Sequence, residues 1–172
     1  MKRTVAAAGA ALSVLSSALA GEAYAPMAAF APLDGRTYRA EWTDESGKKT
    51  IDVASYELIL GGRALQSTHR IEGSTYGGRS IIFYDEGAKE YVFHYFTTAG
   101  FHTTGTAKME DGVLIASEAV KGHAIVAAVE SRSRFDPEKL SVEVVYVGKD
   151  GSRSPQPVRA YLPTANRGDL FP

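Results

Sequence analysis

The amino-acid sequence predicts an all-β protein that forms a single closed antiparallel up-and-down barrel of about ten strands. From Gly35 onward, short runs of β-branched and aromatic residues recur about every 8 to 12 residues, the spacing of β-sandwiches and barrels. Short connections rich in Gly, Asp and Pro join these runs and suit tight hairpin turns. A meander of hairpins leaves two unpaired edges unless its first and last strands pair. Closure is therefore favoured over a sandwich, which would need longer crossovers.

The N-terminus has the composition of a secretory signal. Two basic residues follow Met1, and an uncharged run rich in Ala, Leu, Val and Ser extends from Val5 to Ala20. The run is diluted by serines, whereas a spanning helix needs about 20 strongly apolar residues, so no membrane anchor is predicted. Ala18-Leu19-Ala20 matches the small-residue pattern of signal peptidase sites, and Ala23-Tyr24-Ala25 is weaker because Pro26 follows it. We expect cleavage after Ala20 and a periplasmic or secreted protein.

The rest of the chain divides into three parts. Residues 21–33, with two prolines and many alanines, are expected to form a flexible lead-in, residues 34–163 the barrel domain, and residues 164–172 a polar tail. The expected strands are Arg36 to Thr43, Thr50 to Leu60, Arg63 to Ile71, Gly78 to Tyr84, Glu90 to Thr97, Phe101 to Met109, Val113 to Ala119, Ala124 to Phe135, Leu140 to Val147 and Gln156 to Leu162.

The connections between these runs carry turn chemistry. Gly61-Gly62, Ala99-Gly100 and Asp111-Gly112 supply residues that accept positive φ, and Asp136-Pro137-Glu138-Lys139 predicts a type I turn with Pro at its second position. A short helix is the alternative for Thr50 to Leu60. We favour a strand there because the segment is rich in β-branched and aromatic residues.

Composition excludes several classes of protein. There is no cysteine in the 172 residues, so neither disulfides nor a lipidated N-terminal cysteine can be present. Removing Lys2 and Arg3 from the 19 basic side chains leaves 17 against 20 acidic ones, a net charge near −3 for the mature chain. Nucleic acid is therefore not expected as a partner, because its recognition requires a basic surface.

No specific catalytic or metal-binding motif is present. The sequence has no Gly-x-Ser-x-Gly elbow and no phosphate-binding Gly loop, so no catalytic residue is assigned. The four histidines have no metal-ligand spacing, and no metal site is expected. His94 and His102 flank one predicted hairpin and share a face with Glu90 and Lys108, which indicates the solvent side.

His69 differs from the other histidines because it alternates with the inner face of its predicted strand. Leu65, Ser67, His69 and Ile71 share one parity, which we predict to face the interior. Three roles are open to an inward histidine: a hydrogen-bonded core group, a polar anchor for an organic ligand, or an axial ligand of haem iron.

The fifth and sixth predicted strands hold the densest aromatic cluster. Small residues, Gly105 and Ala107, fall opposite large ones and leave room for a ligand. The face could therefore line an apolar pocket in which tyrosine hydroxyls orient the ligand, and ordinary core packing is the alternative. The residues of this candidate site are Tyr91, Phe93, Tyr95, Phe101 and Thr103.

Arg132 is a further candidate. It shares a face with Glu130 and Arg134 on the eighth predicted strand. Such a row of charges is typical of a solvated face, but an inward Arg132 could hold an acidic group of a ligand.

Several segments resemble a known family. They are Leu60-Gly61-Gly62-Arg63-Ala64-Leu65, Tyr76-Gly77-Gly78, Phe83-Tyr84-Asp85 and the run from Tyr91 to Phe101. From about Leu33 to Tyr161, the chain resembles a bacterial domain-of-unknown-function family among the lipocalin-like β-barrels. The resemblance implies a calycin-type barrel and no established activity. The chain is also distantly similar to nitrobindin, a ten-stranded barrel that binds haem through a histidine late in its sequence. No histidine follows His123 here, so that ligand has no counterpart and no cofactor is predicted.

Three functions compete. The leading hypothesis is an exported barrel that binds a small, mostly apolar molecule in its lumen, with His69 orienting it. The second is a cofactor-free isomerase, cyclase or hydrolase that uses an inward histidine and a carboxylate such as Glu57, Glu72 or Glu118. The third is a homodimer or partner interface formed by exposed aromatic residues of the fourth to sixth strands.

Overall fold

The fold is described by a computed structural model that covers residues 24–43 and 46–167. The expected signal sequence and its cleavage site lie outside these residues. Within them the chain forms one short helix and eleven strands. In chain order they are η1 (Ala25–Leu33), β1 (Thr37–Thr43), β2 (Lys49–Ile59), β3 (Ala64–Ile71), β4 (Gly77–Asp85), β5 (Glu90–Thr97), β6 (His102–Glu110), β7 (Val113–Lys121), β8 (Val126–Asp136), β9 (Lys139–Gly148), β10 (Arg153–Pro155) and β11 (Arg159–Pro163).

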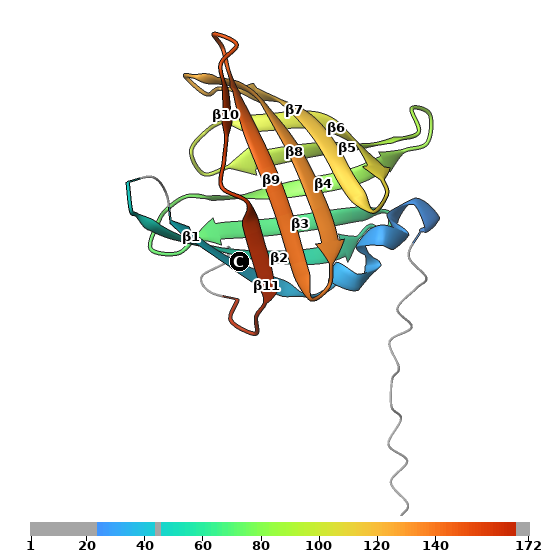
Figure 1. Cartoon of the computed structure of the whole chain (residues 1–172). Coiled ribbons are helices and arrows are strands. Elements are labelled where there is room, and N and C mark those ends of the chain that lie inside the picture. Colours follow the sequence, from blue (N-terminus) through green and yellow to red (C-terminus); the bar gives the residue numbers. More distant parts are fainter. Residues whose placement is uncertain (1–23, 44–45, 168–172) are drawn as a thin grey trace, which may run out of the picture.

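The strands form a closed antiparallel barrel (Figure 1). Strands β1 to β9 pair in sequence as a meander, and β11 then pairs with both β9 and β1 to complete the ring. Ten strands make up this ring, because β10 pairs only with β9, on the same edge as β11 and further along. The predicted fold class is therefore confirmed, and a two-sheet sandwich is excluded.

The strands expected from the sequence are all present, with one shortened at its start. The segment expected from Gln156 becomes a strand only at Arg159, and the three-residue β10 was not predicted because its flanks carry turn residues. The segment from Lys49 to Ile59 is a strand rather than the alternative helix. Gly61, Gly62, Gly100 and Gly112 all have positive φ, as the predicted turns require.

The N-terminal part of the barrel corrects the expectation of a flexible lead-in over residues 21–33. Residues 25–33 form the 3-10 helix η1, in which Met27, Phe30 and Leu33 are fully buried. These three residues are spaced by three, and residues three apart eclipse one another in a 3-10 helix. The spacing therefore places all of them on one face, a pattern that the surrounding alanines and prolines obscured.

Helix η1 closes one end of the barrel. The Phe30 ring packs edge-on against Tyr91 and Phe135, with ring centroids 5.4 and 5.2 Å apart. The Tyr91 hydroxyl donates a hydrogen bond of 2.6 Å to the Pro26 carbonyl and so ties β5 to the helix. The core at this end also includes the fully buried Leu65.

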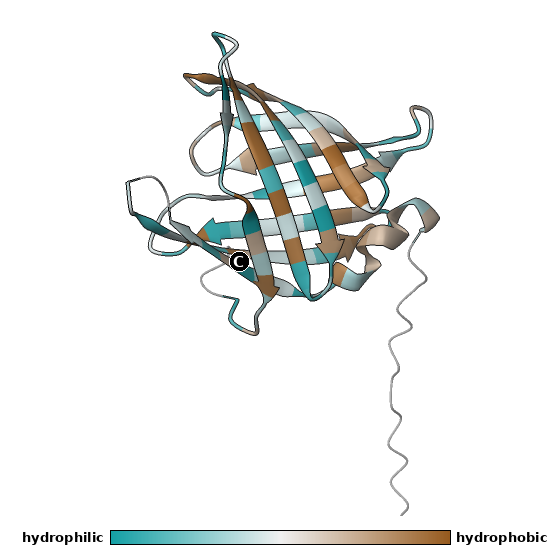
Figure 2. Ribbon diagram, in the orientation of Figure 1, coloured by the Kyte–Doolittle hydropathy of each residue, from teal (hydrophilic) through white to brown (hydrophobic). Residues whose placement is uncertain are grey.

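The lumen changes character along its length. Hydrophobic and polar residues alternate along the strands, so one row of side chains points inward (Figure 2). Met27, Phe30, Leu33 and Leu65 are fully buried at the end closed by η1, whereas the inward side chains of Phe93, Val129 and Tyr146 keep part of their surface exposed. Protein atoms therefore do not cover these three inward side chains completely. Among the described residues, no helix has the length and apolar character needed to span a membrane.

The helix should contribute much of the stability of the closed end. Replacing Phe30 with Ala removes a fully buried ring and its two aromatic contacts, and we expect the free energy of unfolding to fall by about 3–5 kcal/mol, measured by urea denaturation. The control is Ala28→Ser at an exposed position of the same helix, which should change it by less than about 0.5 kcal/mol. Equal stability of the two variants would show that η1 does not seal the core.

Candidate functional site

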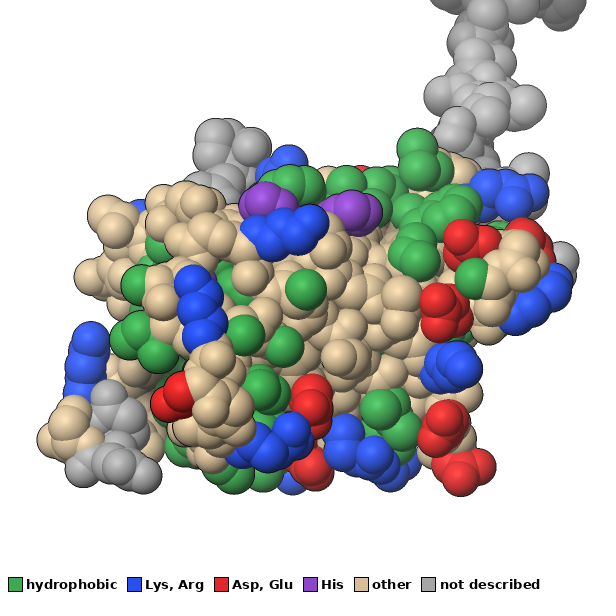
Figure 3. Space-filling view, turned by 90° about the horizontal axis from the view of Figure 1, so that it is seen from above, with side chains coloured by type: hydrophobic (Ala, Val, Ile, Leu, Met, Phe, Trp, Pro, Cys, Tyr) green, Lys and Arg blue, Asp and Glu red, His purple; other side chains and the backbone are tan. Residues whose placement is uncertain are grey.

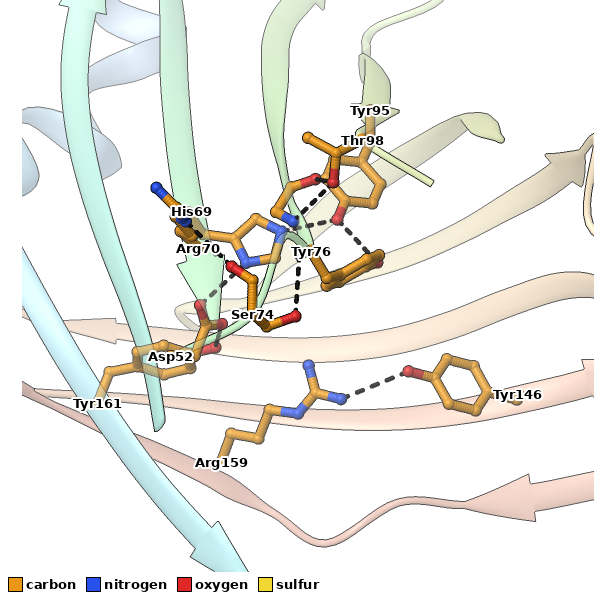
Figure 4. A network of polar contacts seen from close by, with 11 residues as sticks. Asp52, His69, Arg70, Ser74, Tyr76, Tyr95, Thr98, Tyr146, Arg159 and Tyr161 are labelled. Atoms are coloured by element: carbon orange, nitrogen blue, oxygen red, sulfur yellow. Dashed lines mark hydrogen bonds and ion pairs between the residues drawn. The ribbon is translucent and has the colours of Figure 1, made fainter. Parts of the chain in front are cut away.

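A chain of polar side chains crosses the partly filled half of the lumen (Figure 4). His69, on β3, points inward as its alternation with Leu65 predicted. Its Nδ1 lies 3.0 Å from Asp52 Oδ1 on β2, and its Nε2 lies 2.7 Å from the Tyr95 hydroxyl on β5. Three strands that are not all adjacent are thus joined by one imidazole.

The chain continues at both ends. The Tyr161 hydroxyl on β11 donates to Asp52 Oδ2 over 2.7 Å, and the Tyr76 hydroxyl lies 3.1 Å from that of Tyr95. Tyr76 belongs to the loop between β3 and β4, which lies at the end of the barrel away from η1. Side chains from β2, β3, β5, β11 and one loop therefore form a single connected network.

The partners determine where the protons lie. Asp52 accepts hydrogen bonds from Tyr161 and from His69 Nδ1, as a carboxylate must. With a neutral His69, Nε2 accepts the Tyr95 hydroxyl proton, and Tyr95 oxygen then accepts from Tyr76. Burial raises the pKa values of Tyr95 and Tyr161, so both hydroxyls keep their protons. If His69 instead donates from Nε2, the hydrogen bonds from Nε2 to Tyr76 run in the opposite direction.

A glycine makes room for this arrangement. Gly78 pairs with His69 across β3 and β4, and the Tyr95 ring lies directly over it. A Cβ at this position would overlap both the Tyr95 ring and the Phe96 carbonyl. The missing side chain therefore lets the Tyr95 hydroxyl reach His69.

Arg159 lies next to this network on β11, two residues before Tyr161 and on the same inward face (Figure 4). Its guanidinium carbon is 4.8 Å from the centre of the Trp42 ring, and its Nη2 is 3.4 Å from the Tyr146 hydroxyl. Its Nε is buried and has no hydrogen-bond partner. Within the described part of the chain, Arg159 forms no ion pair.

Glu118 is a second inward carboxylate. It lies on β7 and accepts a short hydrogen bond from the hydroxyl of Thr103 on β6. Burial raises the pKa of Glu118, and the hydrogen bond from Thr103 offsets part of that rise. The carboxyl group is therefore more easily protonated than an exposed glutamate.

The structure brings some of the predicted site residues together. The Tyr95 hydroxyl forms a hydrogen bond with His69, and Phe93, two residues earlier on β5, also points into the lumen. Thr103 donates a hydrogen bond to Glu118. Tyr91 lies at the closed end, against η1. Phe101 lies at the opposite end, where its ring stacks on Tyr76 at 6.4 Å.

Arg132 does not join them. The inner face of β8 carries Val129 and Ser131, so Arg132 points outward and is exposed. The expectation that it could hold a ligand group from inside the barrel is wrong. The row of charges on β8 is a solvated face, because alternation places Glu130 and Arg134 on the same outer side.

Three residues of the site, Asp52, Arg159 and Tyr161, were not found from the sequence. The expected carboxylate partners Glu57 and Glu72 are exposed, and the carboxylate beside His69 is Asp52. An acidic residue on the inner parity of a strand was the available signal. For Arg159 and Tyr161 the signal was their spacing of two residues on the last strand, which places both side chains on one face. That face is known to be the inner one only when β11 pairs with β1 and β9 to close the barrel.

The structure does not fit haem held by a lumenal histidine. Both ring nitrogens of His69 are engaged, so coordination of iron would require breaking its bond to Tyr95 or Asp52. His123 lies in the β7–β8 connection, where its Nδ1 accepts from the backbone of Val126. The remaining two histidines lie on the outer face. No cluster of three metal-ligand side chains occurs among the described residues.

The outer face of β4 to β6 carries the remaining histidines and several apolar side chains. His94 stacks on Phe96 at 6.3 Å, and Phe96 stacks on His102 at 6.1 Å. Phe96 is 55% exposed, and Ile81 and Phe83 are exposed beside it. Figure 3 shows histidine side chains next to hydrophobic ones on the molecular surface. The solvent side predicted for both histidines is confirmed.

One groove is open to the outside beside η1. It has a volume of about 480 Å³ and lies between the helix and strands β4 to β6, with Tyr84, Tyr91 and Met109 in its lining. Charged side chains of Lys89, Glu90, Lys108 and Glu110 surround it. None of the residues of the Asp52–His69 network lines it, so it is separate from the candidate site.

Comparison with known proteins supports the fold. The chain resembles the crystal structure of Rv2717c from M. tuberculosis, a nitrobindin-like calycin barrel, with a TM-score of 0.64. The match covers 84% of this chain and 99% of that one at 12% sequence identity. No family model and no curated protein matches the sequence. At this identity the similarity shows a shared fold, a closed antiparallel β-barrel.

Glu118 should make stability depend on pH. Its folded-state pKa lies above its unfolded value, so ionised Glu118 destabilises the fold increasingly as pH rises through this interval. We expect Glu118→Gln, which can still accept from Thr103, to raise Tm at about pH 7.5, with the gain vanishing near pH 4. Thermal unfolding followed by circular dichroism, with exposed Glu57→Gln as control, measures this gain. A difference in Tm between the wild type and Glu118→Gln that is the same at every pH would contradict this prediction.

Proposed function

We propose that this protein binds a small, mostly apolar molecule in the half of the lumen that lies away from η1. The observation that carries the proposal is the partial exposure of inward-facing Phe93, Val129 and Tyr146, in contrast with the full burial of Phe30 and Leu65 at the closed end. Ligand sites are typically concave and mostly apolar, with a few polar groups that fix orientation. Here the Tyr95 hydroxyl, held in place by His69, supplies such a group.

The location of the protein belongs to the same proposal. The basic, then apolar, N-terminus favours export to the periplasm or the exterior. A cysteine-free barrel whose core is sealed by a helix can hold its fold there without disulfides. The role would then be to carry or sequester a small hydrophobic molecule outside the cytoplasm.

Filling the lumen should abolish binding. We expect neutral apolar probes, decanamide and 2-naphthamide, to raise the Tm of the wild type, because a ligand at 100 times its Kd stabilises the native state by about 2.7 kcal/mol. Val129→Trp places a large ring in the lumen and should remove this shift, whereas Arg132→Trp puts the same ring on the exposed side of the same strand. Differential scanning fluorimetry gives the readout. An unchanged Tm for the wild type with every probe would refute the proposal.

A second candidate function is acid–base catalysis in the same lumen, favoured by the contact between Asp52 and His69. The His69 side chain is 18% exposed and that of Asp52 only 3%, so a ligand can reach the imidazole but not the carboxylate. A buried carboxylate that orients a histidine, itself bonded to a hydroxyl, is an arrangement suited to moving protons. The reaction class is isomerisation, cyclisation or hydrolysis without a cofactor.

Exchange of α-protons tests this candidate. We expect the wild type to accelerate exchange of the α-protons of cyclohexanone into deuterium oxide, and His69→Gln to lower that rate by about 100-fold or more, because general acid–base groups contribute on this scale. His94→Gln, at an exposed histidine on the outer face, is the matched control and should keep the rate. Proton NMR follows the exchange. A wild-type rate equal to that of buffer alone would leave binding as the sole candidate.

A further inference from the structure

We propose that the lumenal ligand carries a carboxylate group and that Arg159 binds it. The inference rests on the proposed lumenal binding and adds the chemical class of the ligand. It starts from one observation: a guanidinium faces the lumen with a buried, unbonded Nε, and no described carboxylate lies within ion-pair distance of it. A charge in such a place is costly unless it is paired, and arginine cannot lose its proton to avoid the cost.

Burial lowers the pKa of Arg159, and the nearby Tyr161, Tyr146 and Asp52 more than offset this effect. Among the described residues, however, no carboxylate forms an ion pair with the guanidinium. Trp42 packs against the guanidinium plane and supports it without accepting a conventional hydrogen bond. The Tyr146 hydroxyl is 3.4 Å from Nη2, at the long end of the hydrogen-bond range, and is neutral. A strong acceptor is therefore missing at Nε.

The nearby acidic residues are already engaged. Both oxygens of Asp52 accept hydrogen bonds, from His69 and from Tyr161. Glu118 accepts from Thr103. Neither carboxylate forms an ion pair with Arg159, although the charge of Asp52 contributes to the raised pKa of the arginine, so within the described residues Nε still lacks an acceptor.

The shape of the site selects the class of group. Guanidinium presents parallel donors in a plane, which match the two oxygens of a carboxylate. Tyr146 provides a second donor beside it (Figure 4). On the neighbouring strand Tyr146 is opposite Val129, and this row continues through Glu118 to Gly105 and Phe93. The apolar remainder of a ligand held at Arg159 can therefore extend along Val129 toward Phe93.

Matched ligand pairs test the inference. The pairs are decanoic acid with decanamide and 2-naphthoic acid with 2-naphthamide, titrated by calorimetry at about pH 7.5, where each acid is ionised. We expect the wild type to bind each acid at least about tenfold more tightly than its amide, in keeping with the strength of a charged hydrogen bond. Arg159→Gln should remove this preference while leaving amide affinity within about threefold.

Two further variants make the result specific. Arg159→Lys keeps the charge and loses the planar pair of donors, so it should retain only part of the preference. Arg153→Gln removes an arginine that is exposed and paired with Glu130, and its affinities should equal those of the wild type. If Arg159→Gln does not fold, the acid-to-amide affinity ratios of the wild type and of Arg159→Lys decide whether Arg159 binds a carboxylate.

The outcomes separate the two proposals. Equal wild-type affinity for acid and amide, or an acid affinity that Arg159→Gln does not lower, overturns the carboxylate inference and leaves lumenal binding intact. Failure of every probe to bind the wild type overturns lumenal binding itself. Tight binding of acids that is lost only in Arg159→Gln and weakened in Arg159→Lys supports both.

Discussion

The pairing of β11 with its two neighbours is the constraint on which the rest of the structure depends. Only three residues of β11 pair with β1 and three with β9, yet these pairs join the two ends of a ten-stranded meander. The same strand brings Arg159 and Tyr161 into the lumen. Closure of the barrel therefore also assembles the candidate site. Without the pairing of β11, Asp52 would lose the hydrogen bond from Tyr161, and Arg159 would not lie in the lumen.

Asp52 reinforces this closure from the inside. Its carboxylate lies between Tyr161 on β11, which is separated from β2 by β1, and His69 on the adjacent strand β3. Buried polar networks of this kind stabilise and specify a fold only when each member is satisfied, since an unpaired member costs more than an apolar replacement. Every member from Tyr161 to Tyr76 has a partner, so the network also fixes the register of the strands that supply it.

The two halves of the lumen divide the tasks of the molecule. Helix η1 and the rings around Phe30 form a dry, well-packed end that supplies stability. The other half keeps inward side chains partly exposed and collects the polar and charged groups. This separation keeps the packed core of a barrel without disulfides apart from the half that we propose to bind a ligand. Binding and proton transfer would use the same space, since His69 and Arg159 both face it.

The satisfied and unsatisfied groups suggest different roles for neighbouring residues. The hydrogen bonds of His69 are complete within the protein, so its contribution to a ligand would come through Tyr95, Tyr76 or a change in protonation. Arg159 has an open donor and an unpaired charge. An arginine with an open donor beside a hydrogen-bond network that is already complete suits the recognition of an acidic, otherwise apolar molecule.

The sequence by itself determined the all-β class, the approximate positions of the strands and, for the strands of His69 and Tyr95, which face points inward. These are local properties, because the alternation of side chains has a period of two and the turns depend on glycine and proline chemistry. His69 and Tyr95 were assigned to the inner face on that basis, and the structure confirms that they lie there. The prediction for Arg132 was wrong because a row that mixes charged and small apolar residues does not by itself show whether it faces the lumen.

Only the tertiary structure decided which inward residues meet. The partners of His69 come from strands 17 and 26 residues away, and Asp52 meets Tyr161 across 109 residues. Such distances are set by strand register and by closure, neither of which is encoded within a single segment. The role of η1 was hidden for the same reason: three apolar residues among alanines identify a helix only when a barrel end is present to bury them.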